Sequence, residues 1–153
     1  MEGFGPLYVR GRLPLDRPRI LVADDHDAML DTVLSLLQPD FDIVGTVNNG
    51  RDLIREAQRL QPDVIVLDIA MPILNGIEAA RNIREAGLTP RLVFLTLHEQ
   101  SSFVTACFDE GALGYVTKSR LRTDLIPAIR DAISGHHFIS PFLPRGRRQV
   151  DRG

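Results

Sequence analysis

The sequence predicts an α/β fold, a doubly wound sandwich in which a five-stranded parallel sheet lies between two layers of helices. Five short apolar runs alternate with five segments whose apolar residues recur at helical spacing. The run at 64–67 is rich in β-branched residues and lacks polar alternation, which is typical of a central parallel strand covered on both faces. Right-handed βαβ crossovers then place helices on both sides of the sheet.

The first strand is expected at 20–23, where an apolar run stops abruptly at acidic residues. Apolar residues at helical spacing from 28 to 37 predict the first helix, and Pro39 lies just past its end, where a helix must stop. The segment 41–47 alternates loosely, as a strand near the sheet edge does. Asn48-Asn49-Gly50 then supplies turn chemistry.

The second helix is expected over 53–60, and Pro62 closes it. The central strand at 64–67 follows, and the third helical pattern runs from 76 to about 87. The next apolar run, at 92–95, predicts the fourth strand. The middle of the chain therefore continues the same βα alternation.

The fourth helix is expected over 99–110, and Gly111 fits a helix stop. A short fifth strand at 115–117 leads into the last helix, expected at 121–134 and terminated by Gly135. These elements complete the five βα pairs.

Composition narrows the class of protein. With 153 residues, 44% of them hydrophobic and 25% charged, the chain suits one globular domain. A net charge of -2 does not indicate overall electrostatic attraction to nucleic acid or to an anionic membrane surface. The single cysteine, Cys107, excludes an internal disulfide and is expected to be a buried apolar residue. With no secretory pattern and no membrane-spanning apolar stretch, we expect a cytoplasmic protein without membrane contacts.

Five polar or ionisable side chains that could take part in a reaction follow the predicted strands: Asp24, Asp25, Asp68, Thr96 and Lys118. Because the carboxyl ends of parallel strands meet at one edge of a sheet, we expect them to gather there. Three crowded carboxylates repel unless a cation neutralises them, and hard oxygen ligands suit Mg²⁺. Asp68, which ends the central strand, is the candidate nucleophile toward a phosphoryl group. Mg²⁺ and Lys118 would neutralise the phosphoryl charge, and Thr96 would donate a hydrogen bond to it.

Over about 19–140 the sequence resembles the receiver domains of two-component response regulators. No single motif is specific, but their ordered set is. The matching pieces are Ala23-Asp24-Asp25-His26, Leu67-Asp68-Ile69-Ala70-Met71-Pro72 with Asn75-Gly76, Leu95-Thr96, and Gly111-Ala112-Leu113-Gly114-Tyr115-Val116-Thr117-Lys118. Leu95-Thr96-Leu97-His98 and Gly135-His136-His137-Phe138-Ile139-Ser140-Pro141 look most like the NarL/FixJ subfamily.

The resemblance implies a flavodoxin-like (βα)5 sandwich with strand order 2-1-3-4-5. It implies that Asp68 accepts a phosphoryl group from a histidine kinase or phosphotransfer protein, and that Lys118 and Thr96 contact this group. Asp25, Asp68 and the carbonyl of Ala70 would ligate Mg²⁺ directly, with Asp24 acting mainly through a metal-bound water. The Tyr115 ring would change its packing as Thr96 moves. Ala70 and Leu97 are expected to tune the chemistry.

The resemblance also implies a switch of partner binding or dimerisation over 99–134, serving signal transduction and transcriptional control. We expect a flexible N-terminal extension at 1–18, the receiver at 19–140, and a basic tail or linker remnant at 141–153. The NarL/FixJ DNA-binding domain does not follow, which leaves open a truncated regulator or a stand-alone receiver. DNA would be a partner only of a missing C-terminal domain. The tail carries Arg145, Arg147, Arg148 and Arg152, and we favour a solvated tail or linker over nucleic-acid contact.

Other functional classes fit the residues less well. A haloacid dehalogenase phosphatase needs a second acid where Ala70 stands, and acids after the first strand would repel a flavin phosphate. The resemblance to receiver domains implies no turnover enzyme, but a domain that assists its own phosphorylation and autodephosphorylation. The remaining rival is a receiver-like adaptor that works without phosphorylation. His26 is expected to cap the first helix rather than modulate the metal site, and His98 to be a solvated loop residue.

Overall fold

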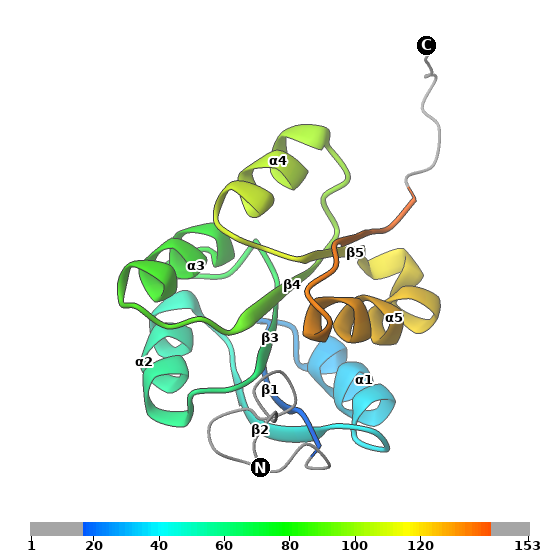
Figure 1. Ribbon diagram of the computed structural model, residues 1–153, viewed down its shortest axis with the longest axis horizontal. Helices are drawn as coiled ribbons and strands as arrows, with labels where there is room; N and C mark the ends of the chain where they lie inside the picture. The colour runs from blue at the N-terminus through cyan, green and yellow to red at the C-terminus, as the bar shows by residue number, and fades with distance from the viewer. Residues whose placement is uncertain (1–16, 142–153) are drawn as a thin grey trace, which may run out of the picture.

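The computed structural model, which describes residues 17–141, has one parallel sheet between two helical layers (Figure 1). Its strands are β1 (Arg19–Ala23), β2 (Asp42–Val47), β3 (Val64–Leu67), β4 (Arg91–Thr96), β5 (Gly114–Thr117) and β6 (Phe138–Ile139). Its helices are α1 (Asp27–Leu37), α2 (Gly50–Leu60), α3 (Gly76–Glu85), α4 (Ser101–Asp109), the short 3-10 helix η2 (Lys118–Arg120) and α5 (Leu121–Ile133). All but two residues of the expected N-terminal extension, and all but Pro141 of the expected tail, lie outside the described residues.

The strand order is β2-β1-β3-β4-β5-β6, and every neighbouring pair is parallel. The expected order of the first five strands is confirmed. The expected number of strands was one too few, because the two-residue β6 extends the sheet beyond β5. Its main-chain hydrogen bonds run from Phe138 N to Leu113 O at 2.9 Å and from Ser140 N to Tyr115 O at 2.8 Å. Two residues carry no readable periodicity, so only the tertiary pairing defines this strand.

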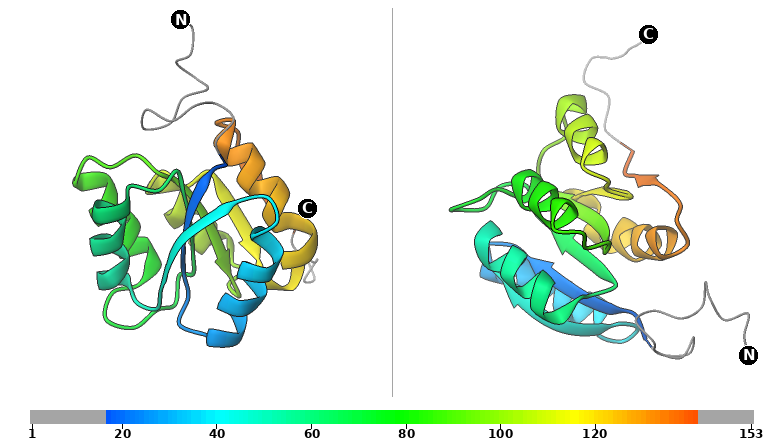
Figure 2. Two further views of the ribbon diagram at one scale, coloured as in Figure 1. Left: turned by 90° about the horizontal axis from the view of Figure 1, so that it is seen from below. Right: turned by 60° about the vertical axis from the view of Figure 1, so that its left-hand side comes forward.

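Helices lie on both sides of the sheet (Figure 2), and the hydrophobic core is divided into two halves, one on each face. Helices α2, α3 and α4 cover one face, and α1 and α5 cover the other (Figure 1). Successive residues of β1 alternate between them: Leu21 packs in the first half and Val22 in the second. Cys107 is buried in the first half, as expected. Both faces of the sheet are covered, and the central strand β3 is accordingly apolar and buried throughout.

Local chemistry fixes where α3 begins. Asn75 is its N-cap: its side chain accepts from Glu78 N at 2.9 Å, and the Glu78 carboxylate accepts from Asn75 N at 3.1 Å, a complete capping box. The backbone N of Gly76 donates to Ile69 O at 2.8 Å. These bonds seat α3 directly on the loop that carries Asp68.

Among residues 17–141, no helix has the combined length and apolar character needed to cross a bilayer.

Candidate functional site

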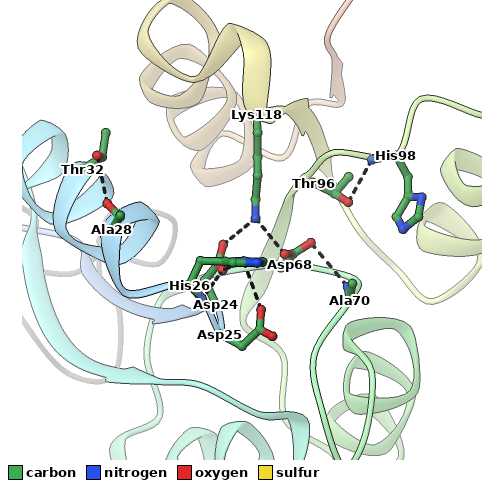
Figure 3. Close-up of polar contacts among 10 residues, drawn as sticks. All are labelled: Asp24, Asp25, His26, Ala28, Thr32, Asp68, Ala70, Thr96, His98 and Lys118. Atoms are coloured by element: carbon green, nitrogen blue, oxygen red, sulfur yellow. Dashed lines mark hydrogen bonds and ion pairs between the residues drawn. The ribbon is translucent and has the colours of Figure 1, made fainter.

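The register of the sheet brings the expected acidic residues to one edge. Ala23 of β1 pairs with Leu67 of β3, so Asp24 and Asp68 follow neighbouring strands at the same level. The backbone N of Asp68 donates to Ala23 O at 3.0 Å, which continues the ladder into the site. Lys118 follows β5 at this edge of the sheet (Figure 3).

Lys118 joins two of the acids. Its Nζ lies 2.8 Å from Asp68 Oδ2 and 2.9 Å from Asp24 Oδ2. All three side chains are about 95% buried, so water screens these ion pairs little. Burial by itself would lower the pKa of Lys118, but the hydrogen bonds to Asp68 and Asp24 outweigh it and raise that pKa. Lys118 is therefore a charged ammonium held at the end of the central strand.

The oxygens of Asp68 are engaged unequally. Oδ2 accepts the ion pair from Lys118, whereas Oδ1 accepts only a long hydrogen bond, 3.4 Å, from the backbone N of Ala70. Ala70 itself is exposed and stands on the loop after β3. Oδ1 is thus the less engaged oxygen of a carboxylate that Lys118 holds in place.

Asp25 and His26 form the exposed side of the cluster. The Asp25 side chain is 33% exposed and that of His26 is 60% exposed. The expectation that the His26 side chain caps α1 was wrong: His26 occupies the N-cap position, but its side chain makes no capping hydrogen bond. Its ring Nδ1 instead lies 3.1 Å from Asp24 Oδ1 and 3.2 Å from Asp25 Oδ1 (Figure 3). Local sequence could not show this, because the ring orientation depends on the acids around it.

The donor set fits a divalent cation. Asp24, Asp25, His26 and Asp68 each offer a donor atom, and these atoms all lie within 4.8 Å of one another. Three of the four are carboxylates, the hard oxygen donors that Mg²⁺ prefers. One ammonium does not balance three carboxylates, so the cluster keeps an excess of negative charge that favours a cation.

Thr96 and Tyr115 are linked through the loop after β4. The buried Thr96 hydroxyl accepts from the backbone N of His98 at 3.2 Å, and the Tyr115 hydroxyl donates to His98 O at 2.7 Å. The Tyr115 ring is fully buried, and this burial raises the pKa of its hydroxyl. The His98 ring stacks on Phe103 with centroids 4.2 Å apart, so this histidine is packed rather than freely solvated.

Leu97 lies beside Thr96 and is 71% exposed. Its side chain therefore does not contribute to the hydrophobic core. Its exposure is compatible with the expected tuning role, which remains a prediction.

Sequence reasoning missed a buried network behind Lys118. Ser140 Oγ donates to Asp124 Oδ2 at 2.7 Å and accepts from the backbone N of Thr117 at 3.2 Å. Arg120 Nε also donates to Asp124 Oδ2, at 2.8 Å. Burial alone would raise the pKa of Asp124, but the hydrogen bonds from Arg120, Ser140 and Thr123 lower it. The network ties β5, α5 and the segment after β6 together, and its only sequence signal was Ser140 within the resemblance to the NarL/FixJ subfamily.

Comparisons with known proteins assign the chain to a family. A family model described as the response regulator receiver domain matches residues 20–130. Response regulator GacA of Pseudomonas viridiflava is 34% identical over 126 residues, which cover 80% of this chain and 58% of GacA. The nitrate/nitrite response regulator protein NarL of Escherichia coli K12 is 35% identical over 126 residues, covering 81% of this chain and 58% of NarL.

Among solved structures, a two-component response regulator of the LuxR family from Aurantimonas sp. SI85-9A1 superposes with a TM-score of 0.78 and 32% sequence identity. The match covers 82% of this chain and 91% of that one. The response regulator domain of Thermotoga maritima CheB gives a TM-score of 0.73 with 28% identity, over 78% of this chain and 98% of the other. These matches confirm the flavodoxin-like sandwich.

Fold and site together define a doubly wound signalling domain. The chain belongs to the response regulator receiver domain family of two-component signalling. Members of this family are signalling proteins and not classical turnover enzymes. They interact with histidine kinases and effector domains, and they bind Mg²⁺. The chain spans 58% of the length of GacA and NarL.

Proposed function

We propose that Asp68 accepts a phosphoryl group from a phosphohistidine of a histidine kinase or phosphotransfer protein. An oxygen of Asp68 attacks phosphorus as the P–N bond of the donor breaks. The leaving imidazole nitrogen keeps the bonding electron pair and takes up a proton. The transferred group then remains on Asp68 until water hydrolyses it, which makes the domain a participant in its own phosphorylation and not an enzyme acting on a separate substrate.

The observation that carries this proposal is the position of Lys118, 2.8 Å from Asp68 Oδ2. When the phosphoryl group arrives, the Lys118 ammonium can leave Asp68 Oδ2 and form an ion pair with a phosphoryl oxygen. There it neutralises the negative charge that grows on the equatorial oxygens of the phosphoryl group. The less engaged Oδ1 is the nucleophile best supported by the geometry. Thr96 would reach the same group by turning its hydroxyl away from His98 N.

For the metal, we assign Asp25, Asp68 and the carbonyl of Ala70 as direct ligands, with Asp24 acting through a water. Bound Mg²⁺ would supply charge neutralisation at the phosphoryl oxygens. Asp24 Oδ2 meanwhile holds Lys118, so this acid serves both the cation and the lysine. Ala70 and Leu97 border the site, and we propose that the exposed Leu97 side chain limits the approach of water to the phosphoryl group.

The output would be a change on the face built from α4, β5 and α5. Thr96, His98 and Tyr115 are joined by hydrogen bonds, so a moving Thr96 hydroxyl releases His98 N and alters the loop that holds the Tyr115 hydroxyl. We propose that this face then changes partner binding or forms a homodimer. In a longer protein carrying a DNA-binding domain, this would serve transcriptional control in the cytoplasm.

The test is labelling by acetyl phosphate with and without Mg²⁺, read by intact-protein mass spectrometry. Wild type should gain one phosphoryl group only with Mg²⁺, and Asp68→Asn should gain none. The matched control Asp31→Asn, an exposed acid on α1, should label like wild type. Labelling of Asp68→Asn would overturn the assignment, and an unlabelled wild type would favour the phosphorylation-independent adaptor.

A further inference from the structure

His26 brings a different donor to the acidic cluster. Nδ1 of its ring lies among carboxylate oxygens, and its side chain makes no capping hydrogen bond to α1. Imidazole nitrogen suits later first-row metals, whereas carboxylates and water suit Mg²⁺. The His26 ring therefore adds a donor atom whose preferred metals differ from those of the three carboxylates.

The distances are those of hydrogen bonds, and they are also close to the spacing of adjacent ligand atoms in a coordination shell. In an octahedral site with metal–ligand bonds of about 2.1 Å, adjacent ligand atoms lie about 3.0 Å apart. Nδ1 of His26 lies 3.1 Å from Asp24 Oδ1 and 3.2 Å from Asp25 Oδ1, close to that spacing on both sides. Asp24 can hold Lys118 at the same time, because the lysine uses Oδ2 and the ring approaches Oδ1.

The side chains that would have to adjust are the exposed ones. His26 and Asp25 are 60% and 33% exposed, so rotating them displaces water and not core atoms. Nε2 of the ring can carry the proton when Nδ1 offers its lone pair, which is a change of tautomer and not of charge. The buried Asp24 and Asp68 stay where the sheet fixes them.

We propose that His26 determines the metal specificity of this site. With a later first-row ion such as Co²⁺ or Ni²⁺, Nδ1 of His26 ligates the metal beside Asp25, a direct ligand of the proposed site. With Mg²⁺, oxygen ligands and water suffice, and the ring remains hydrogen-bonded to the carboxylates. The inference rests on the divalent-metal site of the proposed function and adds a residue and a selectivity to it.

The experiment measures dissociation constants for Co²⁺ and Mg²⁺ by calorimetry on wild type and two histidine variants. His26→Asn should weaken Co²⁺ binding by at least about tenfold, the size of effect that perturbing even an indirect partner of a metal ligand produces. Mg²⁺ binding should change by less than that. Asn is a favourable N-cap residue, so α1 should still begin at the same place. Equal melting temperatures without metal check that the variant folds.

The matched control is His98→Asn. His98 stands on the loop after β4, and its ring points away from the acids (Figure 3). This variant should bind both metals like wild type. As a second readout, the proton NMR spectrum of the Co²⁺-loaded protein should show a hyperfine-shifted, exchangeable imidazole N–H signal. The signal should persist in His98→Asn and vanish in His26→Asn.

An unchanged ratio of Co²⁺ to Mg²⁺ affinity in His26→Asn would overturn the inference, as would persistence of the shifted imidazole signal. The latter result would place the ion on other histidines, such as the adjacent His136 and His137. In both cases Mg²⁺ binding by wild type would leave the proposed metal site standing. If the wild-type protein bound neither ion, the proposed metal site itself would be contradicted.

Discussion

Gly76 packs so tightly on Asp68 that a Cβ atom at Gly76 would lie 2.0 Å from the Asp68 carbonyl oxygen. The atom in the way belongs to the backbone, so no flexible side chain can make room. The first residue of α3 therefore fixes the position of the loop that carries the proposed phosphoryl acceptor. A glycine is required here for close approach and not for an unusual φ.

Gly76→Ala should destabilise the domain by about 2–3 kcal/mol through overpacking and slow the labelling of Asp68. Gly87→Ala is the control, because Gly87 has φ +83° but a Cβ added there would meet no atom within 4 Å. It should cost only about 1–2 kcal/mol of left-handed strain and leave labelling unchanged. Urea unfolding and labelling kinetics measure both. Equal labelling rates for the two variants would contradict a role of Gly76 in placing Asp68.

Mg²⁺ should raise the melting temperature, because a cation that binds only the folded state relieves the crowding of carboxylates. Asp25→Ala should remove most of this rise. Asp31→Ala, which removes an exposed acid outside the cluster, should keep it. Thermal denaturation with and without Mg²⁺ gives the comparison, and a full Mg²⁺ response in Asp25→Ala would exclude Asp25 as a main ligand.

Ser140→Ala should destabilise the domain by about 1–3 kcal/mol, because it leaves part of the buried Asp124 carboxylate and the backbone N of Thr117 without their partner. Ser102→Ala, at an exposed position of α4, should change stability by no more than about 0.5 kcal/mol. Urea unfolding at neutral pH measures the difference. If the two variants lost the same stability, the Ser140 network would not contribute to the fold.

Stability should fall above about pH 9, and Cys107 should account for the first part of the loss. Burial raises the pKa of its thiol from near 9 to about 12. Because the thiol pKa is higher in the folded than in the unfolded protein, its contribution to the free energy of unfolding is complete below the unfolded-state pKa. This contribution is lost as the pH rises toward the folded-state pKa, by about 2 kcal/mol between pH 9 and 11. Cys107→Ala should flatten this part of the curve. A stability difference between wild type and variant that stays constant from pH 8 to 11 would refute the assignment.

The switch should appear in hydrogen exchange. Adding beryllofluoride and Mg²⁺, as a phosphoryl mimic, should change protection over 99–134, because drawing in Lys118 and Thr96 disturbs the bonds that hold His98 and Tyr115. Tyr115→Phe removes the hydroxyl bonded to His98 O and should lower protection of that loop before any mimic is added. Asp68→Asn should not respond to the mimic. Equal protection with and without the mimic in wild type, together with unchanged oligomeric mass, would rule out the switch.

Local sequence patterns were enough to predict the sandwich and the edge of the sheet that carries the site. Apolar runs and helical spacing are local signals, and parallel strands end at a common edge whatever the details of their packing. For that reason Asp24, Asp68 and Lys118 could be expected together from the order of residues alone. The identity of Asp68 as the acid that ends the central strand follows from the same periodicity.

Tertiary structure alone decided the contacts between distant segments. The sixth strand exists because Phe138 and Ile139 pair with β5, and Ser140 is buried because Asp124 and Thr117 surround it. His26 turns toward Asp24 and not into a cap, since neighbouring charge sets its rotamer. These features depend on register, burial and electrostatics between residues far apart in the chain or on side-chain orientation, and local periodicity encodes none of them.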